Sequence, residues 1–140
     1  MLPPDFDFLR LSYRPDLRVV FLRWTRAVSA QEHRAGYEAG LALAQQAIAG
    51  HWLIDLRNRG LAAQEEFAWV LTTFRLKLAA ALPAVSRRLA YLVTPYHADL
   101  IRERLATMEP TYSLVVQQSA AIDVFTEEQQ AQQWLATGHR

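Results

Sequence analysis

Short, nearly continuous apolar runs alternate along this chain with longer segments in which apolar residues recur at helical spacing. The first two runs are Phe8 to Tyr13 and Leu17 to Trp24. Between them Arg14-Pro15-Asp16 favours a tight turn, so the three segments together predict a β-hairpin. Further strands are predicted over Trp52 to Leu56, Leu89 to Val93 and Tyr112 to Val116, and a short extended segment over Ile122 to Phe125.

Helical patterns fill the intervals between these runs. Ser29-Ala30-Gln31-Glu32 matches a capping box, in which side chains satisfy free amides at a helix start. The helix after it carries Tyr37, Leu41, Ala44 and Ile48 on one face and ends before Gly50. Three more helices are predicted. The first runs from Gln64 to Leu82 and is closed by Pro83. The second starts at Thr94-Pro95, a cap followed by proline, and runs to Met108; the third starts at a second capping box, Thr126 to Gln129, and ends at about Ala136.

The resulting element order is β-β-α-β-α-β-α-β-α. Strands that alternate with helices pair in parallel through right-handed crossovers, whereas a hairpin makes the first strand antiparallel. We therefore predict an α/β fold with a mixed sheet of about five strands, beginning with a β-hairpin and flanked by alternating helices. No linker or repeat interrupts the pattern, so we expect one domain over residues 1–140.

Composition narrows the classes of function. Hydrophobic residues make up 51% and charged residues 21%, which is typical of a globular protein. Cysteine is absent, which excludes disulfides, thiolate catalysis and zinc–thiolate sites. A net charge of +1 argues against nucleic-acid binding. The start MLPPDFDF lacks the features of a signal peptide, and no apolar stretch is long enough to cross a bilayer, so we expect a cytoplasmic protein without membrane insertion.

Few residues point to catalysis. The four histidines (His33, His51, His97 and His139) lack metal-ligand spacing, so no metal site is predicted. Neither a Gly-x-Ser-x-Gly elbow nor a phosphate-binding glycine loop is present, and no nucleophile can be paired with a base. We therefore expect a non-enzymatic protein without a cofactor. Gly36 and Gly40, a Gly-x-x-x-Gly pair, indicate close helix packing.

Three features carry a resemblance to a known family: the long helix around Tyr37 and Leu41, the strand Trp52-Leu53-Ile54-Asp55-Leu56-Arg57, and the ending Val124-Phe125-Thr126 to Trp134-Leu135. With the initial hairpin, they resemble the STAS domains and, more narrowly, the bacterial SpoIIAA-like proteins. The resemblance spans nearly the whole chain and implies a β-α superhelix with a mixed sheet flanked by helices. It also implies a role as a protein-interaction or regulatory module.

The chain departs from that family at the end of the central strand. Anti-sigma-factor antagonists of the family carry a phosphorylatable serine or threonine after the strand's aspartate, and the added charge disrupts docking. The corresponding run here, Asp55-Leu56-Arg57-Asn58-Arg59-Gly60, has no hydroxyl. The nearest downstream hydroxyls, Thr72 and Thr73, fall inside a predicted helix. We therefore expect a module without the phospho-switch.

The same run supplies the candidate site. Ligands of open α/β sheets bind beyond the carboxyl ends of parallel strands, where we place Asp55, Arg57, Asn58 and Arg59. Thr94, Tyr96 and His97, which follow the next strand, would share that edge. Guanidinium groups near a helix start suit a carboxylate, a phosphate or a protein partner.

The alternative is that the arginines are only solvated, with one of them neutralising Asp55 or Glu65. Alternation places Asp55 and Arg57 on the same strand face. Arg57 is therefore expected to pair with Asp55 or reach solvent. Arg59, in the turn before Gly60, is expected to be freer and to point away from the core.

Two functions follow as hypotheses. The first is a non-catalytic STAS-like interaction or regulatory module whose protein partner is unknown. The second is a small-ligand binder of the same fold that takes an anion or a lipid. Apolar residues on both faces of Leu17 to Trp24 also predict a homodimer that uses the hairpin or its neighbours, provided that helices cover mainly one side of the sheet.

Overall fold

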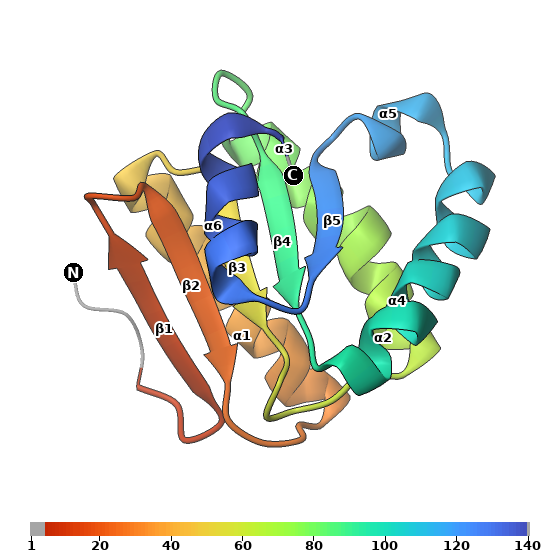
Figure 1. The fold of residues 1–140 in the computed structure, drawn as a ribbon. Helices are drawn as coiled ribbons and strands as arrows, with labels where there is room; N and C mark the ends of the chain where they lie inside the picture. Colours follow the sequence, from red (N-terminus) through yellow and green to blue (C-terminus); the bar gives the residue numbers. More distant parts are fainter. Residues whose placement is uncertain (1–4, 140) are drawn as a thin grey trace.

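One five-stranded sheet runs through the computed structural model, which describes residues 5–139. The strands lie side by side in chain order, with β1 antiparallel to β2 and all later pairs parallel (Figure 1). This confirms the predicted α/β fold with a mixed sheet that begins with a hairpin, and the arrangement is consistent with a STAS-like fold. The strands are β1 (Leu9–Arg14), β2 (Val19–Trp24), β3 (His51–Asp55), β4 (Arg88–Leu92) and β5 (Ala121–Phe125).

Helices connect the parallel strands in the predicted alternation. The helix predicted over Gln64 to Leu82 is one helical run with a π-helical turn in its middle. Such turns insert one extra residue into the helix and are common near functional sites. The helical elements are α1 (Ala30–Ala47), α2 (Gln64–Trp69), η1 (Val70–Phe74), α3 (Arg75–Ala81), α4 (Pro95–Met108), η2 (Glu109–Thr111), α5 (Leu114–Gln117) and α6 (Glu128–Thr137).

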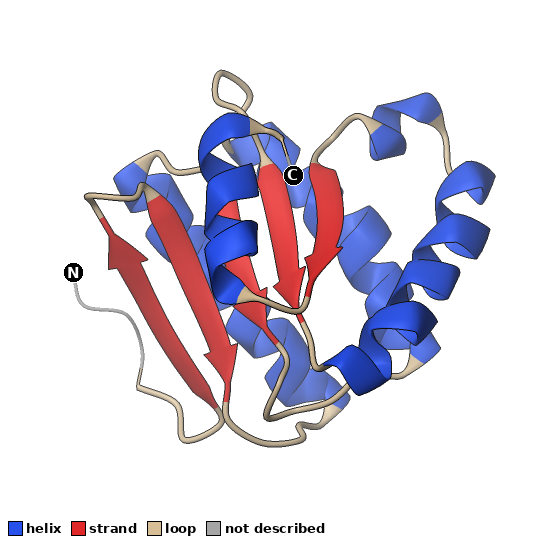
Figure 2. Cartoon of the chain, viewed as in Figure 1, coloured by secondary structure: helices blue, strands red, loops and turns tan. Residues whose placement is uncertain are grey.

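Different helices cover the two faces of the sheet. Trp52 and Ile54 of β3 point into the larger core with α1, the α2–η1–α3 run and α4, whereas Leu53 points to the opposite face. Among the described helices, α6 lies across this face (Figure 2), where it covers Phe21 together with Leu53. The premise of exposed aromatics on the hairpin is therefore wrong, because Phe21 is buried beneath the last helix.

Two sequence features of α1 are confirmed in detail. The Ser29 hydroxyl accepts from the Glu32 backbone N–H at 3.1 Å, and the Glu32 carboxylate accepts from the Ser29 N–H at 3.0 Å, completing the capping box. Gly36 and Gly40 let the helix approach the sheet closely. A β-carbon would lie 2.5 Å from the Trp24 ring at Gly36 and 2.9 Å from the Trp52 ring at Gly40.

The strand predicted over Tyr112 to Val116 is wrong. Ser113 caps the short helix α5 there, accepting from the Val116 N–H at 3.4 Å. A short apolar run cannot be assigned to strand or helix by periodicity alone. The buried Arg75 fixes this segment by donating to the Glu109 carboxylate and to the Gln117 and Ala120 carbonyls.

The second predicted capping box is also wrong. Helix α6 starts at Glu128 after Glu127, which makes no side-chain cap. Near this helix start both Glu128 oxygens instead accept from Arg23 of β2, at 2.8 and 3.0 Å. The start of α6 is therefore tied to the sheet instead of being capped by Thr126.

Candidate functional site

The candidate residues lie at the carboxyl ends of β3 and β4, but the structure divides them among separate surroundings. Asp55 and Arg57 face α6, with the exposed Asn58 beside them. Arg59 turns toward α1 on the other side of the sheet. Thr94 and His97 lie close to the Gly60 turn instead. They therefore do not form one site.

Arg57 belongs to a closed ionic group, here called the Asp55 cluster: Arg23, Asp55, Arg57 and Glu128. Arg57 donates to the two Asp55 oxygens at 3.0 and 2.9 Å. Arg23 bridges Asp55 at 3.0 Å and Glu128 at 2.8 Å. Burial acts to raise the pKa of Asp55, but the Arg57 and Arg23 hydrogen bonds outweigh it and hold that pKa below its usual range. Two cations meet two carboxylates, so the cluster joins β2, β3 and α6, and its charges are balanced.

Arg59 has different surroundings from those expected. The backbone turns sharply here, with Gly60 at a φ of 81°, and the N–H groups of Arg59 and Gly60 both donate to the Leu56 carbonyl. The Arg59 guanidinium lies over the Trp24 ring, 4.8 Å from its centroid. The expectation that Arg59 is freer and points away from the core is therefore wrong.

Among residues 5–139 no carboxylate pairs with the Arg59 guanidinium. Within residues 5–139 its one hydrogen bond runs from Nε to the Gly60 carbonyl at 3.3 Å. Its Nη1 atom is buried without a partner among the same residues. The indole nitrogens of Trp24 and Trp52 are also buried without a partner among these residues. All three of these atoms are hydrogen-bond donors.

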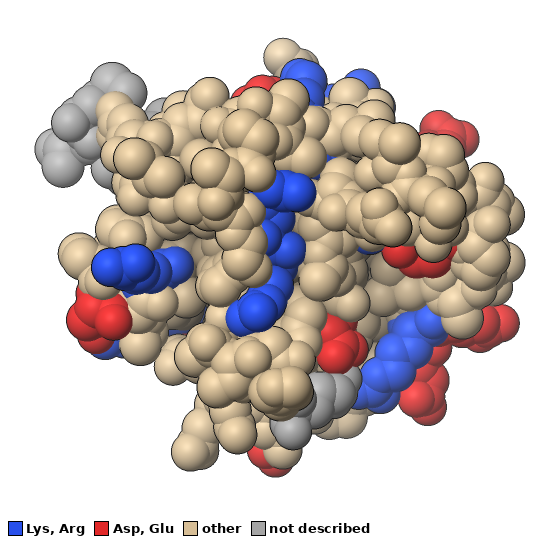
Figure 3. All heavy atoms as spheres, turned by 90° about the horizontal axis from the view of Figure 1, so that it is seen from above, with Lys and Arg blue, Asp and Glu red and all other residues tan. Residues whose placement is uncertain are grey.

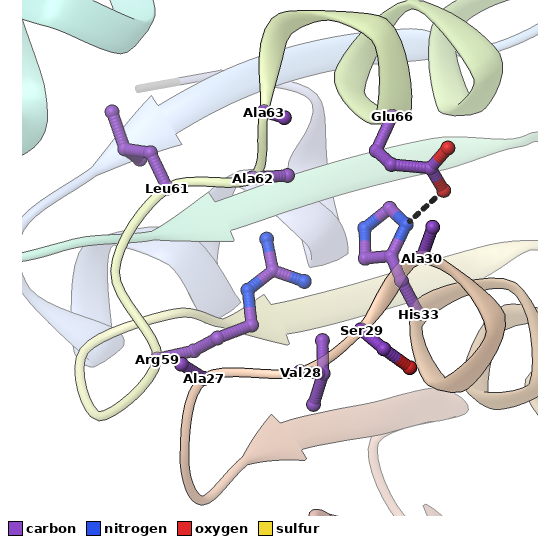
Figure 4. Close-up of a pocket in the computed structure, with 10 residues that line it drawn as sticks. All are labelled: Ala27, Val28, Ser29, Ala30, His33, Arg59, Leu61, Ala62, Ala63 and Glu66. Carbon is purple, nitrogen blue, oxygen red and sulfur yellow. Dashed lines mark hydrogen bonds and ion pairs between the residues drawn. The ribbon is translucent and has the colours of Figure 1, made fainter.

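A pocket of about 180 Å³ opens beside this guanidinium. We call it the Arg59 pocket, and Figure 4 shows the Arg59 side chain extending into it toward His33, between the start of α1 and the loop before α2. Arg104 of α4 steadies that loop by donating to the Ala62 carbonyl at 2.8 Å. The pocket is lined by Ala27, Val28, Ser29, Ala30, His33, Arg59, Leu61, Ala62, Ala63 and Glu66.

His33 and Glu66 form the opposite wall of the Arg59 pocket. His33 is 2% exposed, and its Nδ1 lies 3.2 Å from Glu66 Oε1. Burial, and next the nearby positive charge of Arg59, lower the pKa of His33 to about 4, so its ring is neutral at neutral pH. Arg34 donates to both Glu66 oxygens at 3.1 and 2.9 Å and lowers the pKa of that carboxyl.

Sequence reasoning missed this pair, because His33 and Glu66 are 33 positions apart in the chain. One signal was available for His33: it lies one helical turn before Tyr37 and thus on the buried face of α1. No local pattern marks Glu66 as its partner.

The candidates that follow β4 stand apart from the Arg59 pocket. Thr94 Oγ1 lies 3.4 Å from His97 Nδ1, and a β-carbon at Gly60 would lie 3.8 Å from the His97 ring. Tyr96 is 88% exposed, with its ring 5.0 Å from that of His97. These side chains border the Gly60 turn and do not line the Arg59 pocket.

Basic side chains are also prominent on the opposite edge of the sheet. Figure 3 looks onto the edge where the parallel strands begin and shows lysine and arginine side chains in a band across its middle. From this edge Arg87 donates to the Ser119 carbonyl and Arg88 to the Leu135 carbonyl. These arginines hold loops and α6 in place.

Residues 5–139 were also compared with the requirements of a metal site and of a membrane-spanning helix. No three histidine, aspartate or glutamate side chains in this range gather as a metal ion would require. None of its helices combines the length and apolar character needed to cross a bilayer.

Comparison of the chain with models of protein families, with curated proteins and with solved structures gives no match. Membership of the STAS-like family therefore stays a prediction from the sequence.

Proposed function

We propose that this protein is a non-catalytic module that binds a small anionic ligand in the Arg59 pocket. The observation that carries the proposal is the buried Arg59 Nη1 atom, which has no hydrogen-bond partner among residues 5–139. Every cation of the Asp55 cluster, by contrast, is already neutralised.

Electrostatics favour an anion at this position. A buried charge without a counterion costs several kcal/mol before relaxation, and a bound anion would remove that cost. The pocket also adjoins the start of α1, a helix of 18 residues whose positive end favours negative charge. The neutral His33 adds no repulsion.

Thermal denaturation in the presence of benzoate, acetate or inorganic phosphate tests the proposal. We expect at least one anion to raise the melting temperature of the wild type and to have no such effect on Arg59→Met, which keeps an apolar side chain over Trp24. Arg57→Met is the matched control because it removes an arginine from the Asp55 cluster, and it should keep the response. An anion response that survives in Arg59→Met, or no response in the wild type, would overturn the proposal.

A second candidate function, a protein-interaction or regulatory module without a phospho-switch, rests on a different observation. Leu114 and Val115, successive residues of α5, are 68% and 71% exposed. Neighbouring exposed apolar side chains commonly mark interfaces. They are the surface we propose for a protein partner or for a homodimer.

Light scattering of the wild type and of the double variant Leu114→Ser, Val115→Ser tests this second candidate. A dimer at tens of micromolar, about the range of ordinary affinities, that dissociates in the variant would support it. A monomeric wild type that also captures no protein from its host would count against it.

A further inference from the structure

The charge inside the Arg59 pocket limits the kind of anion that fits. Glu66 is neutralised by two hydrogen bonds from Arg34, and His33 is neutral. Arg59 therefore contributes the one uncompensated charge among the residues that line the pocket. A monoanion would balance that charge, whereas a dianion would leave a negative excess next to Glu66.

The lining limits the body of the ligand. Alanine, valine and leucine are most of the residues that line the pocket: Ala27, Val28, Ala30, Leu61, Ala62 and Ala63. Such a wall offers dispersion contacts and no hydrogen bonds, so it suits an apolar group. An apolar cavity of roughly 150 Å³ accommodates benzene, and the Arg59 pocket, at about 180 Å³, has room for a ring of that size together with a small polar group.

The arrangement of donors limits the polar group. Arg59 uses Nε on the Gly60 carbonyl, which leaves its two terminal nitrogens without partners among residues 5–139. Two parallel N–H donors match the two oxygens of a carboxylate. Figure 4 shows these terminal nitrogens at the inner end of the side chain, facing His33 and Ala62.

Resting on the proposed anion-binding function, we infer that the ligand is a small monocarboxylate with an apolar body about the size of a benzene ring. Its carboxylate lies against the Arg59 guanidinium, and its apolar body lies against Val28 and Ala62. The net charge of the lining excludes a phosphate monoester as the preferred ligand.

Isothermal titration of the wild type with three probes tests this inference. Benzoate is the expected ligand, benzamide has the same shape without the charge, and phenyl phosphate carries a second negative charge. Charge-assisted hydrogen bonds are worth about 1.5–3 kcal/mol, so benzamide should bind roughly 10- to 150-fold more weakly than benzoate. Phenyl phosphate should also bind more weakly than benzoate, and Arg59→Met should lose the preference for benzoate over benzamide.

The possible outcomes separate this inference from the proposed function. Tighter binding of phenyl phosphate or inorganic phosphate that depends on Arg59 would overturn the monocarboxylate and leave the anion site standing. Equal binding of benzoate and benzamide would overturn the monocarboxylate, and if acetate and inorganic phosphate also failed to bind it would overturn both. Amide chemical-shift changes caused by benzoate should centre on the residues around Arg59 and His33, and changes confined to α4 or α5 would also overturn the inference.

Discussion

The Arg59 guanidinium lies 4.8 Å from the centroid of the Trp24 ring, and its Nη1 atom is buried without a hydrogen-bond partner among residues 5–139. Only two positions earlier in the chain, Arg57 donates to both oxygens of Asp55. Two arginines from one turn are thus in opposite electrostatic states, one neutralised and one not. That contrast makes them a matched pair for mutation.

Exchange of each arginine for methionine should change stability in opposite directions. Without ligand, Arg59→Met removes an uncompensated charge and keeps the contact with Trp24, so the free energy of unfolding should rise by about 1 kcal/mol. Arg57→Met leaves the buried Asp55 with fewer hydrogen-bond donors, so the free energy of unfolding should fall by about 1–2 kcal/mol. Urea denaturation measures both values, and a destabilised Arg59→Met would show that this guanidinium is satisfied in solution.

Stability should also fall in acid because of His33. Its pKa is about 4 in the folded protein and near 6.5 when unfolded, so protons bind the unfolded chain preferentially. The contribution of neutral His33 is complete above about pH 6.5, decreases as the pH falls toward 4, and changes no further below that. Between pH 7 and pH 4.5 the stability lost through His33 amounts to roughly 2–3 kcal/mol.

The variant His33→Phe isolates this effect, because it keeps a ring between Trp24 and Tyr37 and removes the titrating group. Chemical denaturation of the two proteins at several pH values should give curves that converge as the pH falls, with the wild type losing more stability. Parallel curves would mean that His33 has an ordinary pKa in the fold.

Much of the fold could be predicted because its signals are local. The Ser29–Glu32 capping box, the apolar run of β3 and the turn between β1 and β2 each specify their own element. The segment from Tyr112 to Val116 could not be assigned in this way. Its helical form depends on Arg75, which reaches it from a distant helix.

The candidate site could be predicted only in part. Strand alternation places Asp55 and Arg57 on one face, and their pairing follows from that. The inward turn of Arg59 depends on the left-handed backbone conformation of Gly60. The sequence of this short loop does not specify the direction in which the Arg59 side chain points. The contact of His33 with Glu66 is a tertiary one that no spacing rule specifies.

Gly36 offers a test of the contact between α1 and the sheet. In Gly36→Ala the new β-carbon would lie 2.5 Å from the Trp24 ring and 3.0 Å from Leu9. Overpacking of this kind costs about 1–3 kcal/mol and should outweigh the better helix propensity of alanine. The reverse exchange at the neighbouring exposed position, Ala35→Gly, measures propensity alone, and a Gly36→Ala protein more stable than the wild type would contradict the close contact.

Ligand binding should be coupled to protonation of His33. Burial is the larger cause of its low pKa, and the positive charge of Arg59 is the next. An anion bound to Arg59 cancels that second contribution, so the pKa of His33 rises in the complex. Because the complex then holds more protons than the free protein, benzoate should bind more tightly as the pH falls from 7 to 5. Titrations at pH 5 in buffers of different ionisation enthalpy should show more net proton uptake in the wild type than in His33→Phe. Binding that strengthens as the pH rises, or uptake that is undiminished in His33→Phe, would show that the bound anion does not lie within reach of both Arg59 and His33.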